Sequence, residues 1–307
     1  MSLMNYQSNK TAPIALFAYA RKEHLHQSVQ SLLLNPQSVL SSLYVFCDGP
    51  ATEKIKRQTE EVRAYVDAIQ GFKSVTRIYS AANLGLARSI INGVSYVLER
   101  HGCVIVMEDD LVVSPHFLSY MNQGLQMYAD EPRVASIHGY CYPVDKKLPE
   151  TFFLRGADCW GWATWQHAWR HFESDGQALL DRLNASNLIN EFDYDGAYSY
   201  SGMLRNQIVG KNSSWAIRWH ASCFLRNLLT LYPAQSLVNN IGNDGSGTHS
   251  SPTHAFDQIT STNPVFLKSI SVVESKFARD VFVRYFRKQH SFSQRVFRKL
   301  RAFTRSI

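Results

Sequence analysis

Short apolar runs and helical patterns alternate along the first 140 residues of the chain. Residues 14–19, 43–47 and 103–107 each form a compact apolar run with the length of a strand, and residues 75–79 are read as a further strand between them. Between these runs, apolar side chains recur at three- and four-residue spacing, which predicts amphipathic helices. Strands and helices in regular alternation predict βαβ units, a parallel sheet and right-handed crossovers. We therefore expect an α/β fold.

The pattern becomes irregular after about residue 140. Residues 184–214 are rich in Asn, Ser, Tyr and Asp, which predicts a mobile loop, and residues 234–254 form a second polar stretch dense in Gly and His. We accordingly divide the chain into a sheet-forming half at residues 12–140, a second half of the same domain at 141–275, and a tail at 276–307.

Composition and charge narrow the class of protein. At 45% hydrophobic and 19% charged residues, the 307-residue chain can bury a core and is not disordered. No apolar run approaches the roughly 20 residues that span a bilayer. Most of the net charge of +7 lies after residue 278, so the body of the chain is close to neutral. This distribution argues against a basic face that binds nucleic acid.

The cysteines and the first apolar run bear on the compartment. Five cysteines, an odd number without zinc-finger spacing, indicate a reduced, cytoplasmic chain without a disulfide framework. Residues 12–20 superficially mimic a signal peptide. The run is short and interrupted by Pro13, and cleavage would remove a strand that the sheet needs. We therefore expect a strand there.

The fourth predicted strand ends in three consecutive carboxylates, Glu108, Asp109 and Asp110. Open α/β sheets bind ligands beyond the carboxyl ends of their strands. Adjacent carboxylates repel one another, and their oxygens suit Mg²⁺ or Mn²⁺ that carries substrate phosphates. The alternative is a solvated acidic turn, or acids placed near the positive end of the next helix. We expect Ser114 to cap that helix and Pro115 to begin it, which weakens the second alternative.

This acidic strand end, followed by a hydrophobic strand and a helix, resembles the metal-binding motif of A-type (GT-A fold) nucleotide-sugar glycosyltransferases. The family 2-type enzymes and the N-acetylglucosaminyltransferase I group are the most similar. Residues 13–33, 44–49 and 158–169 resemble, in the same order, the uracil-binding loop, the strand whose aspartate contacts the base, and a Gly-Trp segment below the acceptor. The resemblance covers about residues 12–250. It implies a GT-A-like Rossmann-type, mostly parallel sheet flanked by helices, with an irregular C-terminal acceptor region.

The resemblance also implies roles for single residues. Asp110 would bind the metal directly, and His249 would complete the metal or diphosphate site. Trp160, Trp162 and Arg218 would lie at the acceptor site. For the tryptophans the alternative is a core position, and for His249 a solvated loop. The residues implied to contact the donor are Arg21, Asp48, Asn83, Arg88, Glu108 and Asp109.

The chain departs from the family at the catalytic base. The N-acetylglucosaminyltransferase I group carries this base in a Trp-Asp-Asp-Trp segment, but residues 215–219 here read Trp-Ala-Ile-Arg-Trp. Replacement candidates are Asp195 and Asp244, which we favour, and Asp158 and Asp193. Each of them is alternatively an ordinary turn residue. Arg218 could instead contact a phosphate or pair with an acidic acceptor.

The basic tail allows two interpretations. In one helix over residues 282–304, Phe and Tyr side chains would face one side and Arg and Lys side chains the other. Such a helix suits the surface of an anionic membrane. Equally, it could dock on its own domain with a solvated basic face.

The function that these observations favour is metal-dependent, inverting glycosyl transfer. A hexosyl or N-acetylhexosaminyl group would pass from a nucleotide-diphosphate donor, a UDP-sugar, to a glycan or lipid-linked acceptor in bacterial surface polysaccharide synthesis. The enzyme would be cytoplasmic and peripheral on the inner face of the membrane, with Mn²⁺ or Mg²⁺ as cofactor and no nucleic-acid partner. Two alternatives remain: a nucleotidyltransferase, although residues 17–23 lack a glycine, and a non-catalytic sugar-binding or membrane-active, haemolysin-like protein on the same scaffold.

Overall fold

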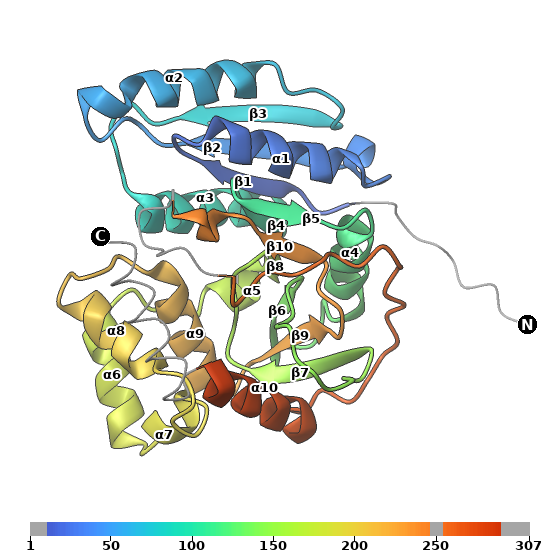
Figure 1. Cartoon of the computed structure of the whole chain (residues 1–307), viewed down its shortest axis with the longest axis vertical. Coiled ribbons are helices and arrows are strands. Elements are labelled where there is room, and N and C mark those ends of the chain that lie inside the picture. The colour runs from blue at the N-terminus through green and yellow to red at the C-terminus, as the bar shows by residue number, and fades with distance from the viewer. Residues whose placement is uncertain (1–10, 246–253, 290–307) are drawn as a thin grey trace, which may run out of the picture.

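The protein is described by a computed structural model that covers residues 11–245 and 254–289. One eight-stranded sheet runs through it in the order β3-β2-β1-β4-β8-β6-β9-β7 (Figure 1). The first four strands of the chain pair in parallel, as their alternation with helices predicts. They are β1 (Ile14–Ala18), β2 (Ser42–Cys47), β3 (Ser74–Tyr79) and β4 (Cys103–Glu108).

The helices between these strands cover both faces of the sheet. The chain moves from β1 to β2 and β3 in one direction, and β4 then lies on the other side of β1. Right-handed crossovers therefore place α1 and α2 on one face and α3 on the opposite face. Gly102, with φ +76°, ends α3 in the left-handed conformation that favours glycine, and its N–H donates to the Leu98 carbonyl. The helices are α1 (Lys22–Leu33), the 3₁₀ turn η1 (Ser38–Leu40), α2 (Glu53–Asp67) and α3 (Leu86–His101).

The second half of the chain extends the same sheet with both parallel and antiparallel strand pairs. Strand β8 is antiparallel to β4 and to β6, β9 is parallel to β6, and β7 is antiparallel to β9. Six of the eight strands, all but β7 and β8, therefore run in one direction, so the sheet is mostly parallel as expected, with two antiparallel strands in its second half. The added elements are α4 (Phe117–Met127), β6 (Val134–His138), β7 (Thr151–Arg155), β8 (Trp162–Trp165), α5 (Gln166–Trp169) and β9 (Leu229–Pro233).

The polar stretch at residues 184–214 contains short helices joined by turns, so the prediction of a mobile loop is wrong. Its polar residues are divided between these helices and turns, while several of its aromatic side chains are buried. Phe192 and Leu204 are fully buried, and Tyr200 is buried. The helices of this region are α6 (Gly176–Ala185), α7 (Ile189–Phe192), α8 (Tyr200–Ile208) and α9 (Trp215–Leu225). They gather beside the second half of the sheet (Figure 1).

The predicted start of the helix after the acidic strand end is also wrong. Helix α4 begins at Phe117, not at Pro115. Ser114 does not cap it: its hydroxyl accepts from the His116 N–H and donates to the Ser261 carbonyl at 2.6 Å. Ser114 thus joins this turn to the C-terminal part of the chain.

The first part of the basic tail is part of the core. Helix α10 (Lys276–Gln289) buries Phe282 and Phe286 against the domain, with the Tyr142 ring 5.0 and 4.9 Å from theirs. Over this helix, docking on the chain's own domain is the correct interpretation. The remaining tail positions, from 290 on, lie outside the described residues. No helix in the described parts combines the length and the hydropathy that crossing a bilayer requires.

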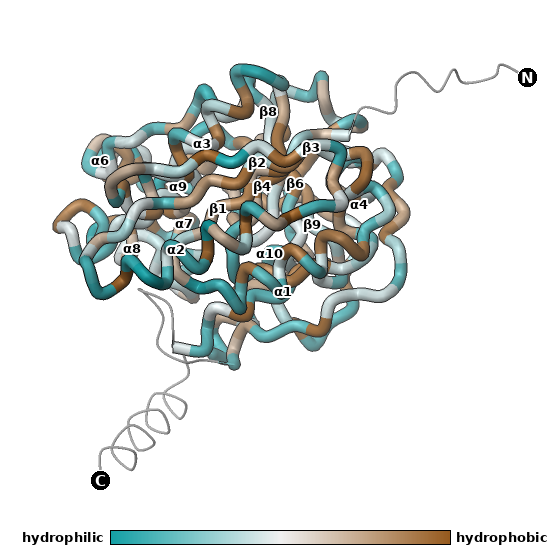
Figure 2. The backbone as a smooth tube through the Cα atoms, turned by 90° about the horizontal axis from the view of Figure 1, so that it is seen from above, coloured by the Kyte–Doolittle hydropathy of each residue, from teal (hydrophilic) through white to brown (hydrophobic). Residues whose placement is uncertain are grey.

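Hydropathy follows this architecture. In Figure 2 hydrophobic segments concentrate where β2, β4 and β6 cross the middle of the molecule, and hydrophilic ones lie on outer elements such as α2 and α8. A second, two-stranded sheet pairs β5 (Leu111–Val113) antiparallel with β10 (Val238–Asn240), and the 3₁₀ turn η2 (Gly242–Asp244) follows β10. This small sheet brings a C-terminal segment to the acidic strand end.

Candidate functional site

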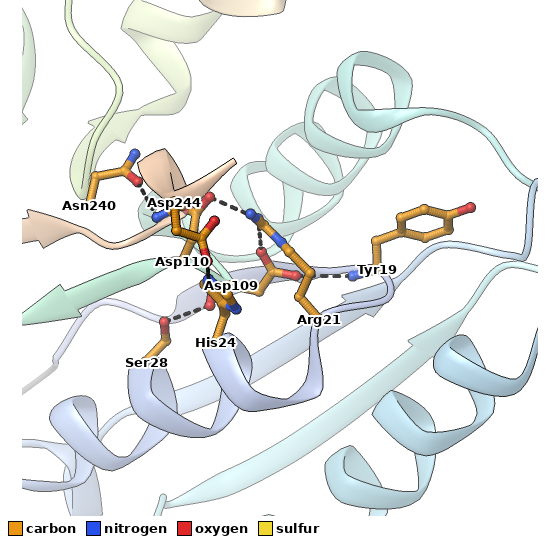
Figure 3. A network of polar contacts seen from close by, with 9 residues as sticks. Tyr19, Arg21, His24, Ser28, Asp109, Asp110, Asn240 and Asp244 are labelled. Carbon is orange, nitrogen blue, oxygen red and sulfur yellow. Dashed lines mark hydrogen bonds and ion pairs between the residues drawn. The ribbon is translucent and has the colours of Figure 1, made fainter. Parts of the chain in front are cut away.

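The acidic strand end lies where the chain reverses its direction across the sheet. Strands β1 and β4 are neighbours, and their following segments leave toward different parts of the fold. Such a topological switch point opens a crevice at the carboxyl ends of the strands, where open α/β sheets bind ligands. Arg21 follows β1, and Asp109 and Asp110 follow the end of β4, so the expected donor-binding arginine meets these two carboxylates in this crevice (Figure 3).

Arg21 holds two of the three carboxylates. Its Nη2 donates to Asp109 Oδ1 and, at 2.8 Å, to Asp110 Oδ2. Asp109 is 4% exposed, and it also accepts from the Tyr19 N–H at 3.4 Å. The guanidinium is thus a positive charge placed between two acids that would otherwise repel each other.

Burial and crowding disfavour the charged form of this cluster. Desolvation, reinforced by the charges of Asp110 and Asp109, raises the pKa of Glu108 to about 8. Burial also raises the pKa of Asp109, although Arg21 opposes this shift. A site that makes carboxylates costly to ionise is one that a cation stabilises.

A third segment closes the crevice from the C-terminal half of the chain. The Ile241 N–H donates to the Asp110 carbonyl at 2.8 Å, and β10 pairs with β5 directly after the acids. The next residue, Gly242, lies so close that a Cβ there would be 2.1 Å from Asp110 Oδ2. Only glycine leaves room for the Asp110 carboxylate at this point.

Asp244, one of the two favoured candidates for the catalytic base, does reach this site. Its Oδ2 lies 3.2 Å from His24 Nε2 on α1. Ser28, one helical turn after His24, donates from its hydroxyl to the Asp109 carbonyl at 2.8 Å. Figure 3 shows Asp244, His24, Arg21 and the acids in one network. His24 and Ser28 were missed by the sequence analysis, although their spacing from Arg21 places all three on the first two turns of one helix.

The resemblance implies that Asp48 contacts the nucleotide base. In the structure its carboxylate instead binds backbone N–H groups of its own chain. Its Oδ1 accepts from the N–H groups of Gly49 and Leu84, and its Oδ2 from the Gly85 N–H, each at 2.8 Å. The Asn83 amide adds a fourth bond at 3.2 Å. The carboxylate therefore anchors residues 83–85, the loop that begins α3, to the end of β2.

The tryptophans divide between core and surface. Trp162 is fully buried and stacks on Trp215 with a centroid distance of 5.5 Å, so it cannot reach a ligand. Trp160 is half-buried, and its backbone N–H donates to His138 Nε2 at 3.1 Å. The expectation of an acceptor-site role therefore fails for Trp162, because its ring belongs to the core, and stays a prediction for Trp160.

The other favoured base, Asp195, is not brought to the acid cluster. It lies between α7 and α8, and Arg279 of α10 donates to both of its carboxylate oxygens, at 2.8 and 2.9 Å. Asp193 accepts at 2.6 Å from both the N–H and the hydroxyl of Ser201, in the first turn of α8. The predicted ligand His249 lies outside the described residues.

Asp158 is a carboxylate among tyrosines. Its Oδ2 accepts from the Tyr142 hydroxyl at 3.1 Å and from the Tyr232 hydroxyl at 3.5 Å. Burial raises the pKa of Asp158 to about 6, although these two bonds and the Cys159 N–H oppose the shift. It lies in the turn between β7 and β8.

Arg88 and Arg218 line one cleft, away from the acids. The cleft has a volume of about 320 Å³ and lies between the beginning of α3 and α9. The resemblance implies a contact with the donor for Arg88 and a contact with the acceptor for Arg218.

The side chains of the crevice can bind some kinds of metal ion and not others. In the described ranges, 11–245 and 254–289, no three His, Cys, Asp or Glu side chains are grouped closely enough to enclose a metal ion. A closed structural site is therefore not formed by these residues. The carboxylate oxygens of Asp110 fit instead a Mg²⁺-like cation that keeps several waters and takes one or two carboxylates together with substrate phosphates.

Comparisons with known proteins add little to this geometry. No known protein family matches the chain, and no curated protein is significantly similar to it. Among solved structures, it is similar to the mannosyltransferase PcManGT from Pyrobaculum calidifontis in complex with GDP-Man and Mn²⁺. The match has a TM-score of 0.32 and 11% identity, and it covers 43% of this chain and 36% of the mannosyltransferase.

Proposed function

We propose that this chain is a metal-dependent glycosyltransferase that takes a sugar from a nucleotide-diphosphate donor. The observation that carries the proposal is the meeting of Asp109, Asp110, Arg21 and Asp244 at the topological switch point of the sheet. Acids buried at this point favour a positive partner, and a divalent cation that in turn carries the diphosphate of the donor is such a partner.

In this proposal the acids and Arg21 divide the work. Asp110 would hold a hydrated Mn²⁺ or Mg²⁺ that keeps several of its waters. The bound cation would stabilise the negative charge on the departing diphosphate. Arg21 keeps Asp109 and Asp110 in place and presents its remaining N–H groups to phosphate oxygens.

The base in this proposal is Asp244. Its side chain is 47% exposed, so an acceptor hydroxyl can approach it, and His24 fixes one of its oxygens. Inverting transfer needs a carboxylate that takes the hydroxyl proton while the oxygen attacks the anomeric carbon. The resemblance supports a UDP-sugar donor and a glycan or lipid-linked acceptor, in cytoplasmic synthesis of bacterial surface polysaccharide.

The test is a thermal-shift panel of UDP, GDP, dTDP and CMP, each with and without Mn²⁺. A nucleotide at about 100 times its Kd adds about 2.7 kcal/mol of stability. We expect a manganese-dependent shift with one nucleotide, lost in Asp110→Asn and kept in Asp181→Asn, a matched change of an exposed carboxylate on α6. The absence of a shift with every nucleotide would contradict the proposal and favour the non-catalytic alternative.

A further inference from the structure

The cleft between α3 and α9 brings two arginines together. Its lining includes Arg88, Arg218, Asn92 and Ser213 and contains no Asp or Glu, although Asp48 accepts from the N–H groups of two further lining residues, Leu84 and Gly85. Two arginines that share a cleft repel each other unless an anion lies between them. All four polar side chains can donate hydrogen bonds.

Arg218 is held in place by neutral groups. Its Nε donates to the Ser214 carbonyl and its Nη1 to the Ser174 carbonyl, both at 3.1 Å. The guanidinium lies 5.8 Å from the centroid of the Phe172 ring. Partial burial lowers the pKa of Arg218, because its charge is desolvated without a carboxylate in compensation.

Two other partly buried arginines of the chain have an acidic partner. Arg155 pairs with Glu191 at 2.9 Å, and Arg279 pairs with Asp195. Arg218 makes no such pair within the described residues, and neither does Arg88, which is exposed at the mouth of the cleft. The geometry is therefore that of an oriented but uncompensated charge, which is what an anion site requires.

The beginning of α3 adds to this charge. The helix is 16 residues long, no side chain caps its first turn, and that turn contains no acid. Gly85, Ala87 and Arg88 of this first turn line the cleft. The N–H groups of Leu84 and Gly85 already donate to Asp48, so what the helix offers a further anion is its dipole and the N–H groups of its first turn.

The cleft is separate from the acid crevice. The crevice is formed with α1, through Arg21, His24 and Ser28, whereas the cleft lies between α3 and α9 on the opposite face of the sheet. Its volume of about 320 Å³ is at the small end of the range for ligand sites, roughly 300–1,000 Å³. It can therefore hold more than one oxyanion group, such as a phosphate with part of the molecule that carries it.

We propose that this cleft binds a phosphate group of the acceptor, so that the acceptor is a phosphorylated molecule. The phosphate site itself stands on the arginines and the helix, and only its assignment to the acceptor rests on the proposed function. Arg88 and Arg218, from the two halves of the chain, then select the acceptor together.

The first experiment is a calorimetric titration of the full chain with inorganic phosphate, at fixed ionic strength. We expect saturable binding that weakens at least tenfold in Arg88→Gln and in Arg218→Gln. Arg100→Gln, at the other end of α3, is the matched control and keeps the wild-type affinity. The Arg88 side chain makes no hydrogen bond to another described residue. Its replacement therefore tests the site without removing a contact that supports the fold. Equal affinity in all variants, or no binding, overturns the proposal, as does tighter binding of acetate than of phosphate.

The second experiment separates donor phosphate from acceptor phosphate. Phosphate is titrated again in the presence of saturating UDP and Mn²⁺. Unchanged affinity, within about twofold, supports an acceptor site that is filled together with the donor. Competition by UDP assigns the cleft to the donor and overturns the proposal. Asp110→Asn distinguishes the proposed glycosyl transfer from the proposed phosphate site. It should remove the manganese-dependent thermal shift with UDP but leave phosphate binding in the cleft intact.

Discussion

Arg279 of α10 holds both carboxylate oxygens of Asp195 through a two-pronged ion pair, 2.8 and 2.9 Å long. The pair fixes the last described helix to the turn between α7 and α8. Asp195 was a candidate for the catalytic base. The ion pair instead gives it a role in holding the C-terminal half together.

The first prediction follows from this pair. Asp195→Asn should lower the free energy of unfolding by about 1 kcal/mol, since bidentate pairs exceed the usual small contribution of a surface pair only modestly. Urea unfolding measures the change, and the rate of sugar transfer should change less than threefold. Loss of transfer by about 100-fold or more with normal stability would return Asp195 to the catalytic machinery.

The second prediction concerns Arg21. In Arg21→Gln, Asp109 remains buried without its ion-pair partner, which costs about 3–5 kcal/mol. Thermal or urea unfolding measures this loss. Mn²⁺ should stabilise the variant more than the wild type, because a cation can replace the missing positive charge. If manganese stabilises both proteins equally, the acids do not bind it.

The third prediction concerns Asp48. In Asp48→Asn one oxygen becomes an amide N–H₂ group, and it then faces donors such as the Gly85 N–H. We expect a loss of about 2 kcal/mol in stability and weaker nucleotide binding, because the loop before α3 is no longer anchored. Asn83→Ala, which removes a longer bond of 3.2 Å to the same carboxylate, should have a smaller effect on both measurements.

The fourth prediction is a pH dependence at Asp158. Its pKa is raised in the folded state to about 6, above the value near 3.9 of an unfolded chain. The stability that it contributes is therefore present in full below about pH 4 and is lost as the pH rises through 6. Relative to Asp158→Asn, the wild type should lose about 2–3 kcal/mol between pH 4 and pH 7.5. Urea unfolding at several pH values gives this difference, and a constant difference would mean that the carboxyl is not desolvated.

The fifth prediction tests the close approach at Gly242. In Gly242→Ala the new methyl group meets Asp110 Oδ2, and it also lies 3.0 Å from Arg21 Nη1. The carboxylate must move, so we expect manganese-dependent nucleotide binding to weaken at least tenfold, with the sheet intact by circular dichroism. Gly210→Ala is a useful contrast, since a Cβ there meets no atom within 4 Å, although its φ of +74° adds local strain.

The sequence predicts the first half of the fold because its signals are local. Strands β1, β2 and β4 are largely apolar runs, the edge strand β3 has fewer apolar residues but is rich in β-branched and aromatic ones, and each intervening helix has its own periodicity. In the second half, β8 consists of Trp162–Trp165, which reads as a tryptophan cluster and not as a strand. Its partners β4 and β6 are set by tertiary pairing, which no local pattern reveals.

The same distinction applies to the site. The three acids are consecutive, so the sequence shows them together. His24 and Asp244, which complete the crevice, are separated by 220 residues. The tail shows what periodicity cannot determine. An amphipathic helix was predicted correctly at residues 282–289, but the pattern allowed its apolar face to contact either a membrane or the domain. In the structure this face is buried against the domain.

The pairing of β5 with β10 also sets the order in which the protein can be completed. Contacts between distant parts of a chain form late, and a chain is synthesised from its N-terminus. The acids and Arg21 belong to the first half, but Gly242 and Asp244 leave the ribosome much later. A nascent chain that ends before residue 238 lacks β10, Gly242 and Asp244, so the acid cluster gains these neighbours only late in biosynthesis.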